Sequence, residues 1–291
     1  MMNGITSTNP ISSRVQRNWD WRAAGNFVGG GSGSGLILWA ALLSPLGYDV
    51  IPLLLTGLAL VAGGLFCVWL EIGRPWRALN VLKHVSSSWM SREAWVAPLL
   101  FLSGLATWLF TPLLLWPTAL LAGAFLYSQS RILRADKGIP AWRHPRAGLL
   151  VVVTGLTEGA GLLVLLLPLL DQPQPLAWGA LLILLALRAF AWRHYRDGLA
   201  EAKAPLASQK RLAAIDTGFF WGGHLLPGLL LGLALVVPAV ATVAGTIALL
   251  TGAWMKYTLI TRAAFTQGFT MQHLPVRGQP SANAAVRKRV A

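Results

Sequence analysis

The sequence predicts an all-α integral membrane protein, a bundle of eight transmembrane helices with both termini cytoplasmic. Of its 291 residues, 55% are hydrophobic and only 12% are charged, which is far from the composition of a soluble domain of this length. The apolar residues gather into eight segments, each near the ~20 residues that a helix needs to cross the hydrocarbon of a bilayer. Lys and Arg residues recur at every second break between these segments, which predicts one orientation in the membrane.

Each predicted span is recognised by its apolar window, and the longest polar connections between the spans are residues 71–93, 131–148 and 193–216. The windows cover residues 23–44, 50–70, 94–111, 115–133, 149–169, 176–192, 217–237 and 239–262. Many of the 14 Trp residues lie beside the ends of these windows, as interfacial anchors do. We expect a polar cytoplasmic N-terminal tail (1–20), a transmembrane domain (21–265) and a basic cytoplasmic C-terminal tail (266–291). The first tail lacks the apolar h-region of a signal peptide, so the first window is expected to remain as a helix.

The distribution of positive charge predicts which face of the bundle is cytoplasmic. All 24 Lys and Arg residues are assigned to the two ends of the chain and to alternate connections, or to the ends of the adjoining spans. The opposite connections, residues 46–49, 111–117, 170–175 and 237–240, carry none. Because cationic loops resist translocation, the charged face is expected on the cytoplasmic side of a bacterial inner membrane. This topology, together with anionic lipid of the inner leaflet, explains the net charge of +14, so we expect no nucleic-acid binding.

The first predicted span contains the glycine-rich run Gly-Gly-Gly-Ser-Gly-Ser-Gly at residues 29–35. The run lacks the Gly-Lys-Ser/Thr ending of a phosphate-binding loop, and no strand precedes it, so a nucleotide site is not expected. Small residues at helical spacing instead allow a neighbouring backbone to approach closely. The alternative is a locally unwound helix that lines a cavity, and Pro227-Gly228 in the seventh span is a second place for such a break.

The sequence offers few ligands for a redox metal. The single cysteine, Cys67, lies inside the second span, which excludes an internal disulfide, a four-thiolate zinc site and an iron–sulfur cluster held by this chain alone. Of the five histidines, only His224 lies within a span, and His194 follows the end of another. Two histidine pairs on facing helices are missing, so we expect no haem and interpret the histidines as solvated or hydrogen-bonded.

Charged and aromatic residues gather where the second span ends and the third begins. Residues 71–80 read Glu-Ile-Gly-Arg-Pro-Trp-Arg-Ala-Leu-Asn, and residues 88–93 read Ser-Trp-Met-Ser-Arg-Glu. Each of the two helix ends has a carboxylate and a guanidinium, and indole rings lie between them in the sequence. Together these groups can form one pocket at the membrane interface. Such a pocket offers hydrogen bonds to a polar head group and a flat apolar space for a ring. Simpler interpretations compete: each Arg also satisfies the positive-inside bias, and the dipole of a helix stabilises Glu93 at its N-terminus.

These two stretches resemble a signature of the membrane-anchor subunits of complex iron–sulfur molybdoenzymes. Glu-Ile-Gly-Arg-Pro-Trp-Arg-Ala followed by Ser-Trp-Met-Ser-Arg-Glu is similar to the family pattern Leu-Gly-Arg-Pro-x-Arg-Ala and Ser-Trp-x-Ser-Arg-Glu. The stretches at residues 19–24 and 138–142 support the resemblance, and its layout extends over all eight spans. The family includes the anchors of dimethyl sulfoxide reductase and of related polysulfide and sulfite enzymes. Within the family, Glu71 before Ile-Gly-Arg-Pro makes the sequence more similar to the anchors of phenylacetyl-CoA:acceptor oxidoreductase and sulfite dehydrogenase.

The resemblance implies a haem-free subunit that exchanges two electrons and two protons with menaquinone or ubiquinone. Its expected partners are an iron–sulfur subunit and a molybdopterin catalytic subunit, which hold the iron–sulfur and molybdenum centres. By motif position, Glu93 matches the acidic residue associated with quinol binding, and Arg74 belongs to the same site. The other residues expected around the quinone are Glu71, Trp76, Arg77, His84, Trp89 and Arg92. A histidine often occupies the position of Glu71 in the dimethyl sulfoxide reductase branch.

Glu158 lies near the middle of the fifth predicted span. An ionisable group at that depth is costly and is by default a functional candidate, here as part of a proton path. The alternative is a protonated Glu that is hydrogen-bonded to neighbouring Thr or Ser. Two other functions are weighed against a quinone-reactive anchor: a multi-pass transporter whose substrate passes Glu158, and a purely structural anchor that does not bind quinone.

Overall fold

The first and last described segments of the chain meet at one end of a helical bundle. The structure is a computed structural model, in which residues 13–72 and 75–267 are described. An isolated antiparallel bridge joins Val15 to Phe265, and the remaining regular structure of these residues is helical. The predicted all-α class is therefore confirmed for the described part of the chain.

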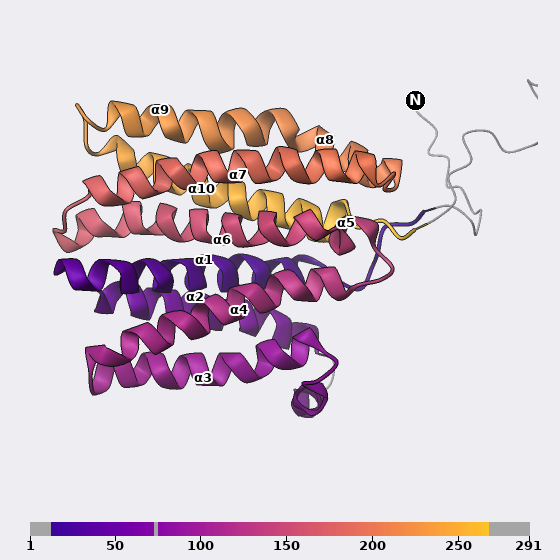
Figure 1. Cartoon of the computed structure of the whole chain (residues 1–291), viewed down its shortest axis with the longest axis horizontal. Helices are drawn as coiled ribbons and strands as arrows, with labels where there is room; N and C mark the ends of the chain where they lie inside the picture. The colour runs from indigo at the N-terminus through magenta and orange to yellow at the C-terminus, as the bar shows by residue number, and fades with distance from the viewer. Residues whose placement is uncertain (1–12, 73–74, 268–291) are drawn as a thin grey trace, which may run out of the picture.

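The long helices lie side by side with roughly parallel axes, and α1 and α6 occupy the middle of the bundle (Figure 1). Their bounds are α1 Trp21–Leu43, α2 Ile51–Glu71, α3 Trp89–Leu109, α4 Leu115–Ala135, α6 Pro145–Leu166, α7 Pro175–Glu201, α8 Leu206–Phe220, α9 Leu226–Leu233 and α10 Val240–Tyr257. Shorter pieces join or extend them: η1 Ser44–Leu46, η2 Pro75–His84, η3 Pro112–Leu114, α5 Pro140–Arg143, η4 Leu167–Leu170, η5 Trp221–Leu225 and η6 Thr258–Arg262. Helices α2, α3 and α4 lie on one side of the α1–α6 pair, and α7 to α10 lie on the other.

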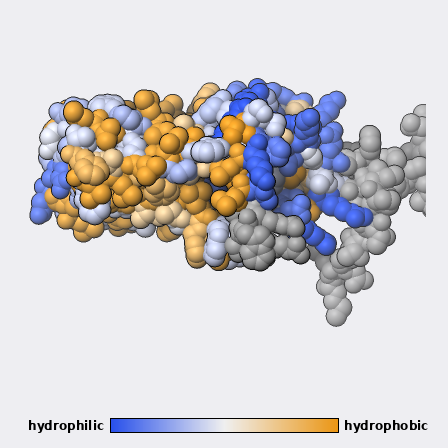
Figure 2. Space-filling view, turned by 90° about the horizontal axis from the view of Figure 1, so that it is seen from below, coloured by the Kyte–Doolittle hydropathy of each residue, from blue (hydrophilic) through white to orange (hydrophobic). Residues whose placement is uncertain are grey.

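Within residues 13–72 and 75–267, five helical segments are long and apolar enough to cross a membrane. They are Trp21–Leu46, Ile51–Glu71, Pro145–Leu170, Pro175–Glu201 and Val240–Arg262. Figure 2 shows the matching apolar surface, with hydrophilic residues gathered toward the end at which α5 lies. These features are those of an integral membrane protein. Helices α3 and α4 and the α8–η5–α9 rod are not among the five, so the prediction of eight spans stays a prediction.

Local capping interactions fix the starts of three long helices at the hydrophilic end. The Asp20 side chain accepts a hydrogen bond from the backbone N–H of Arg22, and Ser88 accepts one from Ser91 at the start of α3. Hydrogen bonds from Arg22 hold the pKa of the Asp20 carboxyl below its usual value. At α6, Nδ1 of His144 accepts from the backbone of Arg146. Burial and the nearby Arg146 cation lower the pKa of His144, which keeps the imidazole neutral and able to accept.

The glycine run of α1 lets two neighbouring helices pack against its backbone. A Cβ on Gly33 would collide with the carbonyl oxygen of Gly57 on α2, and one on Gly35 would collide with that of Gly155 on α6. Close approach of backbones at small residues is a common way for helices to associate in a membrane. The prediction that the run permits such an approach is confirmed, and α1 continues through it without unwinding.

The structure corrects the assignment of all Lys and Arg residues to connections or span ends. Arg188 lies within α7 and Lys256 within α10, and both side chains are fully buried. The stretch at 193–216, predicted as a polar connection, is also mostly helical, because α7 continues to Glu201 and α8 begins at Leu206. Hydropathy sums miss these features because one or two cations in a long apolar helix barely change the average.

The break considered at Pro227-Gly228 is not present. The helix instead continues from α8 through the π-helical segment η5 into α9. Pro227 has no backbone N–H to donate to the carbonyl of Gly223 four residues earlier, and that carbonyl accepts from Nη2 of Arg188 instead. The described residues therefore show a π-helical widening at this depth rather than an unwound segment.

Candidate functional site

A small cavity lies at the hydrophilic end of the bundle, between the starts of α1 and α3 and the end of α2. Its volume is about 50 Å³. Its lining consists of Trp19, Ala23, Asn26 and Phe27, of Val68 and Glu71 from α2, of Met90 and Glu93 from α3, and of Ile132 from α4. We call this space the Glu93 cavity. Two carboxyl side chains predicted from separate motifs, those of Glu71 and Glu93, thus face the same space.

Glu93 lies at the start of the second turn of α3, and its side chain is buried with 7% exposed. Nδ2 of Asn26 on α1 donates a hydrogen bond to Oε1 of Glu93 at 3.4 Å. The backbone carbonyl of Asn26 accepts from Nε2 of Gln129 on α4 at 2.9 Å. Within the described residues, Oδ1 of Asn26 and Oε1 of Gln129 accept no hydrogen bond. Buried polar atoms normally find a partner, so these two acceptors beside a carboxyl mark a place for donor groups of a ligand or water.

Glu71 is the last residue of α2 and is partly exposed. Arg22 contacts both the residue that caps α1 and the end of α2. It forms an ion pair with Asp20 at 2.8 Å and donates from Nη1 to the carbonyl of Leu70 at 3.0 Å. A cation at the C-terminus of a helix is favourable because the helix dipole is negative there. The N-terminal segment, the start of α1 and the end of α2 are thereby tied together beside the cavity.

Three other residues predicted for the quinone site, His84, Trp89 and Arg92, are described and are not among the residues that line this cavity. Arg92 donates from Nε and Nη2 to the carbonyls of Val85 and Ser86, both at 2.9 Å, and its guanidinium covers the ring of Trp89 at 4.2 Å. Trp89 also meets Tyr127 edge-on at 5.6 Å, so it packs between α3 and α4. His84 ends η2 and is exposed. Arg74 and the side chains of Trp76 and Arg77 lie outside the described residues.

Glu158 occupies the middle of the bundle and forms an ion pair that the sequence reasoning missed. Its Oε2 lies 2.6 Å from Nζ of Lys256 on α10, and the exposed fractions of the two side chains are 0% and 1%. Nζ of Lys256 also donates to the backbone carbonyl of Phe27 on α1 at 2.8 Å. The alternative of a protonated Glu bonded to Thr or Ser is therefore wrong, because a lysine is the partner. Within the described residues, Oε1 of Glu158 has no hydrogen-bond partner.

Arg188 on α7 is the second fully buried cation. Its Nη1 donates to the carbonyl of Ala248 at 2.9 Å, its Nη2 donates to Gly223, and its Nε donates to Nε2 of His224 at 3.3 Å. His194, the other histidine considered for haem, instead stacks on Phe190 with ring centroids 5.5 Å apart. The described residues thus hold His224 in a hydrogen bond to an arginine.

The Glu93 cavity and the buried ion pair share a segment of α1. The Phe27 side chain lines the cavity, and the Phe27 carbonyl accepts from Lys256. Glycines make room for this arrangement: a Cβ on Gly30 would collide with the Gln129 amide, and one on Gly31 with Nζ of Lys256. Asn26, Gln129, Arg188 and Lys256 were not predicted as site residues. The available signal was their polarity inside apolar windows, which by itself marks functional candidates in membrane helices.

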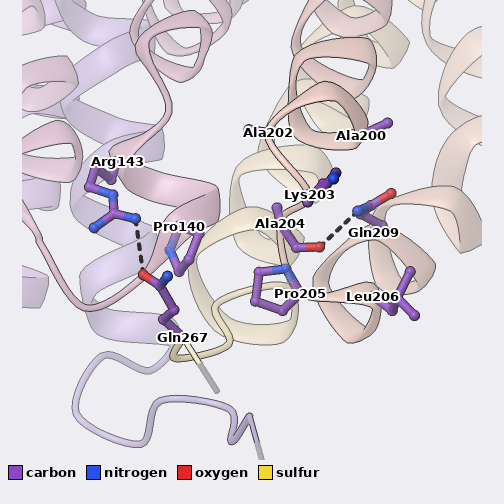
Figure 3. Close-up of a pocket in the computed structure, with 10 residues that line it drawn as sticks. All are labelled: Pro140, Arg143, Ala200, Ala202, Lys203, Ala204, Pro205, Leu206, Gln209 and Gln267. Carbon is purple, nitrogen blue, oxygen red and sulfur yellow. Dashed lines mark hydrogen bonds between the residues drawn. The ribbon is translucent and has the colours of Figure 1, made fainter. Parts of the chain in front are cut away.

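A larger cavity of about 540 Å³ opens at the same end of the bundle, beside α5 and the connection between α7 and α8 (Figure 3). Arg143 on one wall donates to Oε1 of Gln267 at 3.1 Å, and Gln209 on the other donates to the carbonyl of Ala204 at 2.8 Å. Among the described residues, its lining includes Lys203 and no carboxyl group. This cleft is polar and cationic, unlike the carboxyl-lined cavity between α1, α2 and α3, so it suits a water-soluble partner better than a lipophilic ring.

The fold and the site together define a helical membrane protein with a carboxyl-lined cavity at its cationic end. Comparison with protein families identifies the particular class: the family model of the DMSO reductase anchor subunit (DmsC) matches residues 48–191. The match covers just under half of the chain, and it confirms the resemblance drawn from the two motifs. The matched part contains Glu71, Glu93, Glu158 and Arg188, whereas Asn26 and Lys256 lie outside it.

A comparison with curated proteins gives no match. The family therefore supplies the general role, that of a membrane anchor subunit of a DMSO reductase-type molybdoenzyme. The narrower likeness to phenylacetyl-CoA or sulfite enzymes stays a prediction.

Proposed function

We propose that this anchor subunit is quinone-reactive and passes electrons between membrane quinone and an iron–sulfur partner subunit, which in turn serves a molybdopterin catalytic subunit. One observation carries the proposal: Glu93 is buried against Asn26 in a cavity that Glu71 also lines, at the cationic end of the bundle. In this proposal the chain holds no haem, and the iron–sulfur and molybdenum centres belong to the partners. Menaquinone and ubiquinone both satisfy the same contacts.

The residues present fit the chemistry of a quinone head group. A quinol has hydroxyl donors, and the Glu93 carboxyl with the unpaired Oδ1 of Asn26 supplies acceptors for them within the described part of the site. The flat walls come from Trp19 and Phe27. At about 50 Å³ the cavity is far smaller than the ~300 Å³ or more of typical small-molecule sites, so entry of a ring requires side chains to move. Met90 is 44% exposed and is the lining side chain freest to do so.

Quinone chemistry couples two electrons to two protons, and the chain's own part in it is to handle the protons. In the proposed mechanism, Glu93 accepts a proton from a quinol hydroxyl and Asn26 orients the carboxyl through its amide. Glu71, partly exposed at the end of α2, receives protons at the water boundary. The Lys256–Glu158 ion pair lies behind Phe27, whose carbonyl accepts from Lys256, so one positive and one negative group have fixed positions next to the inner wall of the cavity.

Replacing Glu93 by Gln removes the proposed proton acceptor and keeps the shape of the side chain. We expect quinol-linked turnover of the intact complex to fall by about 10²-fold or more, the lower range for loss of a general base. Electron exchange between an artificial dye and the partner subunits should continue unchanged, because it bypasses the membrane site. Steady-state assays with a quinol and with a dye, on the same purified complex, make the comparison.

Glu201→Gln is the matched control for this experiment. Glu201 ends α7 at the same end of the bundle, where it pairs with Arg146 at 3.1 Å and is 65% exposed. Its replacement should leave both activities within a factor of about two, since exposed ion pairs contribute little. Unchanged quinol kinetics in Glu93→Gln would show that the carboxyl has no part in the reaction.

For topology, we propose eight spans with both termini cytoplasmic in a bacterial inner membrane. In this proposal α3, α4 and the α8–η5–α9 rod complete the five apolar segments. The cationic connections and the described parts of both tails lie at the same end of the bundle, which supports the positive-inside orientation (Figure 1). The iron–sulfur and catalytic subunits then dock on the cytoplasmic face, where the cleft beside Arg143 and Lys203 offers a polar surface.

Reporter fusions test this orientation. A reporter that is active only in the cytoplasm, fused after Arg277, should be active, and its periplasm-specific counterpart should be silent. In sealed inverted vesicles the partner subunits should be open to protease, because the cytoplasmic face is turned outward. Protection of the partners in inverted vesicles, or activity of the periplasmic reporter, would reverse the orientation.

The continuous helices argue for an anchor over a transporter. Secondary transporters commonly bind their substrates at broken helices near the midplane. Here α1 continues through its glycine run, and the rod from α8 to α9 stays helical past Pro227. The buried Glu158 is neutralised by Lys256 rather than presented to a passage. Co-purification with iron–sulfur and molybdenum subunits is expected for the anchor, whereas a transporter would purify alone.

A further inference from the structure

A groove runs along the outer surface of the bundle, where α7 lies beside the rod formed by α8, η5 and α9 (Figure 1). Two cavities lie in it, of about 470 Å³ and about 330 Å³, and Phe220 lines both of them. The α7 side of the lining includes Leu182, Leu185, Ala189, Arg193 and Asp197, which recur at the spacing of one helical face. The rod lines the other side from Asp216 to Leu229. We call this feature the α7 groove.

The α7 groove is charged at one end and apolar along the rest. The larger cavity is nearer the hydrophilic end of the bundle, and its lining includes two arginines and two aspartates. Among residues 13–72 and 75–267, the smaller cavity is lined mainly by leucines and alanines and by no Asp, Glu, Lys or Arg. Trp221 lies at the charged end and is 62% exposed, as an indole at a membrane boundary is. A phospholipid presents the same order, from its polar head group to its apolar tails.

The length of the α7 groove matches one leaflet of a bilayer. At the usual rise per residue, the stretch of α7 from Leu182 to Asp197 is about 22 Å long. Half of a bilayer, head-group region included, is about 20–22 Å thick. The tail part opens outward, since Leu182 and Leu229 are 51% and 71% exposed. The groove therefore has room for a lipid from its head group to the ends of its tails, which a free head group or a short alkane does not fill.

The charges at the polar end indicate which head group fits. Asp216 and Arg196 form an ion pair with each other. In the described part of the chain, Arg193 and Asp197 form no ion pair, and the Arg193 guanidinium lies over the Phe220 ring at 4.6 Å. Both side chains are exposed, and they lie one helical turn apart on the same face of α7. The pocket thus offers a ligand one positive and one negative group, side by side.

We propose that the α7 groove binds one phospholipid whose head group carries both a phosphate and a primary ammonium group, the chemistry of phosphatidylethanolamine. The phosphate contacts Arg193, the ammonium contacts Asp197, and the acyl chains lie along the apolar part toward Leu229. Phosphatidylglycerol has no cation for Asp197, and the choline of phosphatidylcholine has no N–H to donate to it. The proposal does not depend on quinone binding. Only the choice of the cytoplasmic leaflet rests on the proposed orientation.

Native mass spectrometry of the purified full chain tests the proposal. The chain is released from detergent micelles that contain phosphatidylethanolamine, phosphatidylglycerol and phosphatidylcholine in equal amounts, with identical acyl chains. We expect the ethanolamine lipid to be retained about tenfold more than either of the others, the ratio expected for one additional charge-assisted hydrogen bond.

Four variants assign the contacts. Asp197→Asn should remove the preference for the ethanolamine head group, whereas Arg193→Gln should lower retention of all three lipids by about tenfold, because each has a phosphate. Gly228→Leu narrows the tail part, where a Cβ already approaches Leu182 at 3.6 Å, and should lower retention of all three as well. Arg211→Gln is the control: Arg211 is an exposed cation of α8 that lines neither cavity, and its loss should change nothing.

Three results would overturn the proposal. Equal retention of the three lipids by the wild-type chain would mean that the groove holds lipid without selecting a head group. A preference for phosphatidylglycerol would mean that it recognises negative charge alone. A preference for the ethanolamine lipid that persists in Asp197→Asn would place the selective contact elsewhere. Because the assay contains no quinone, its result is independent of whether the Glu93 cavity binds one.

Discussion

Replacing Lys256 by Met should lower the free energy of unfolding by roughly 3–5 kcal/mol, the range for breaking a buried ion pair by removing one partner. The cost arises because Glu158, with 0% of its side chain exposed, is left without its partner at 2.6 Å. The Phe27 carbonyl on α1 loses its donor in the same step. Reversible unfolding of the chain in mixed micelles, followed by far-UV circular dichroism, measures the change.

Two further variants isolate the ion pair as the cause. Lys210→Met removes an exposed lysine from α8 and should change stability by less than about 0.5 kcal/mol. The double variant Lys256→Met with Glu158→Gln removes both charges and should recover much of the loss, since the uncompensated charge dominates it. If Lys256→Met is as stable as the wild type, the pair contributes nothing to the fold and its geometry needs another explanation.

Gly159→Ala should separate α1 from α6 and destabilise the bundle by about 1–3 kcal/mol, the usual cost of overpacking a close contact. A Cβ on Gly159 would collide with backbone atoms of Gly35 and Leu36. A long side chain can relieve such a collision by changing its rotamer, whereas backbone atoms move only if the helices separate. Because α1 also forms the inner wall of the Glu93 cavity, quinol-linked turnover should fall together with stability.

Gly179→Ala is the control for this variant. Gly179 lies in α7, where an added Cβ meets nothing within 4 Å. Ala favours a helix over Gly by roughly 0.5–1 kcal/mol, so this change should be neutral or slightly stabilising. Both variants are compared in the same unfolding measurement. Equal stability of the two would mean that the α1–α6 contact yields more easily than the glycine geometry implies.

The sequence predicted the fold class well because hydropathy and small-residue spacing act locally along a helix. The apolar windows gave the long helices within a few residues at most ends, and residues 29–35 were recognised as a surface for close packing. The ends at Glu201 and Leu206 were missed because polar residues continue a helix beyond the membrane boundary without any change in its backbone.

The candidate site was only half predictable. Glu71 and Glu93 were found because they lie in compact motifs at adjoining helix ends, and the structure brings them to one cavity. The pairing of Glu93 with Asn26, and of Glu158 with Lys256, joins residues 67 and 98 positions apart. Such partners depend on which faces of distant helices meet, and hydropathy does not contain that information. Lys256 was assigned to a span end for the same reason.

The junction between residues 14–16 and residues 264–266 has a consequence for the order of assembly. Gln16 donates from its backbone to the carbonyl of Ala264 at 2.8 Å, and Thr266 donates to that of Arg14 at 2.8 Å. Because a chain is made from its N-terminus, α1 therefore acquires its final neighbours only when α10 and the residues that follow it have been made. Until α10 arrives, Glu158 lacks its lysine, so an incomplete chain carries an uncompensated acid within the bilayer. Neutralisation of Glu158 therefore waits for the synthesis of α10, the helix that supplies Lys256.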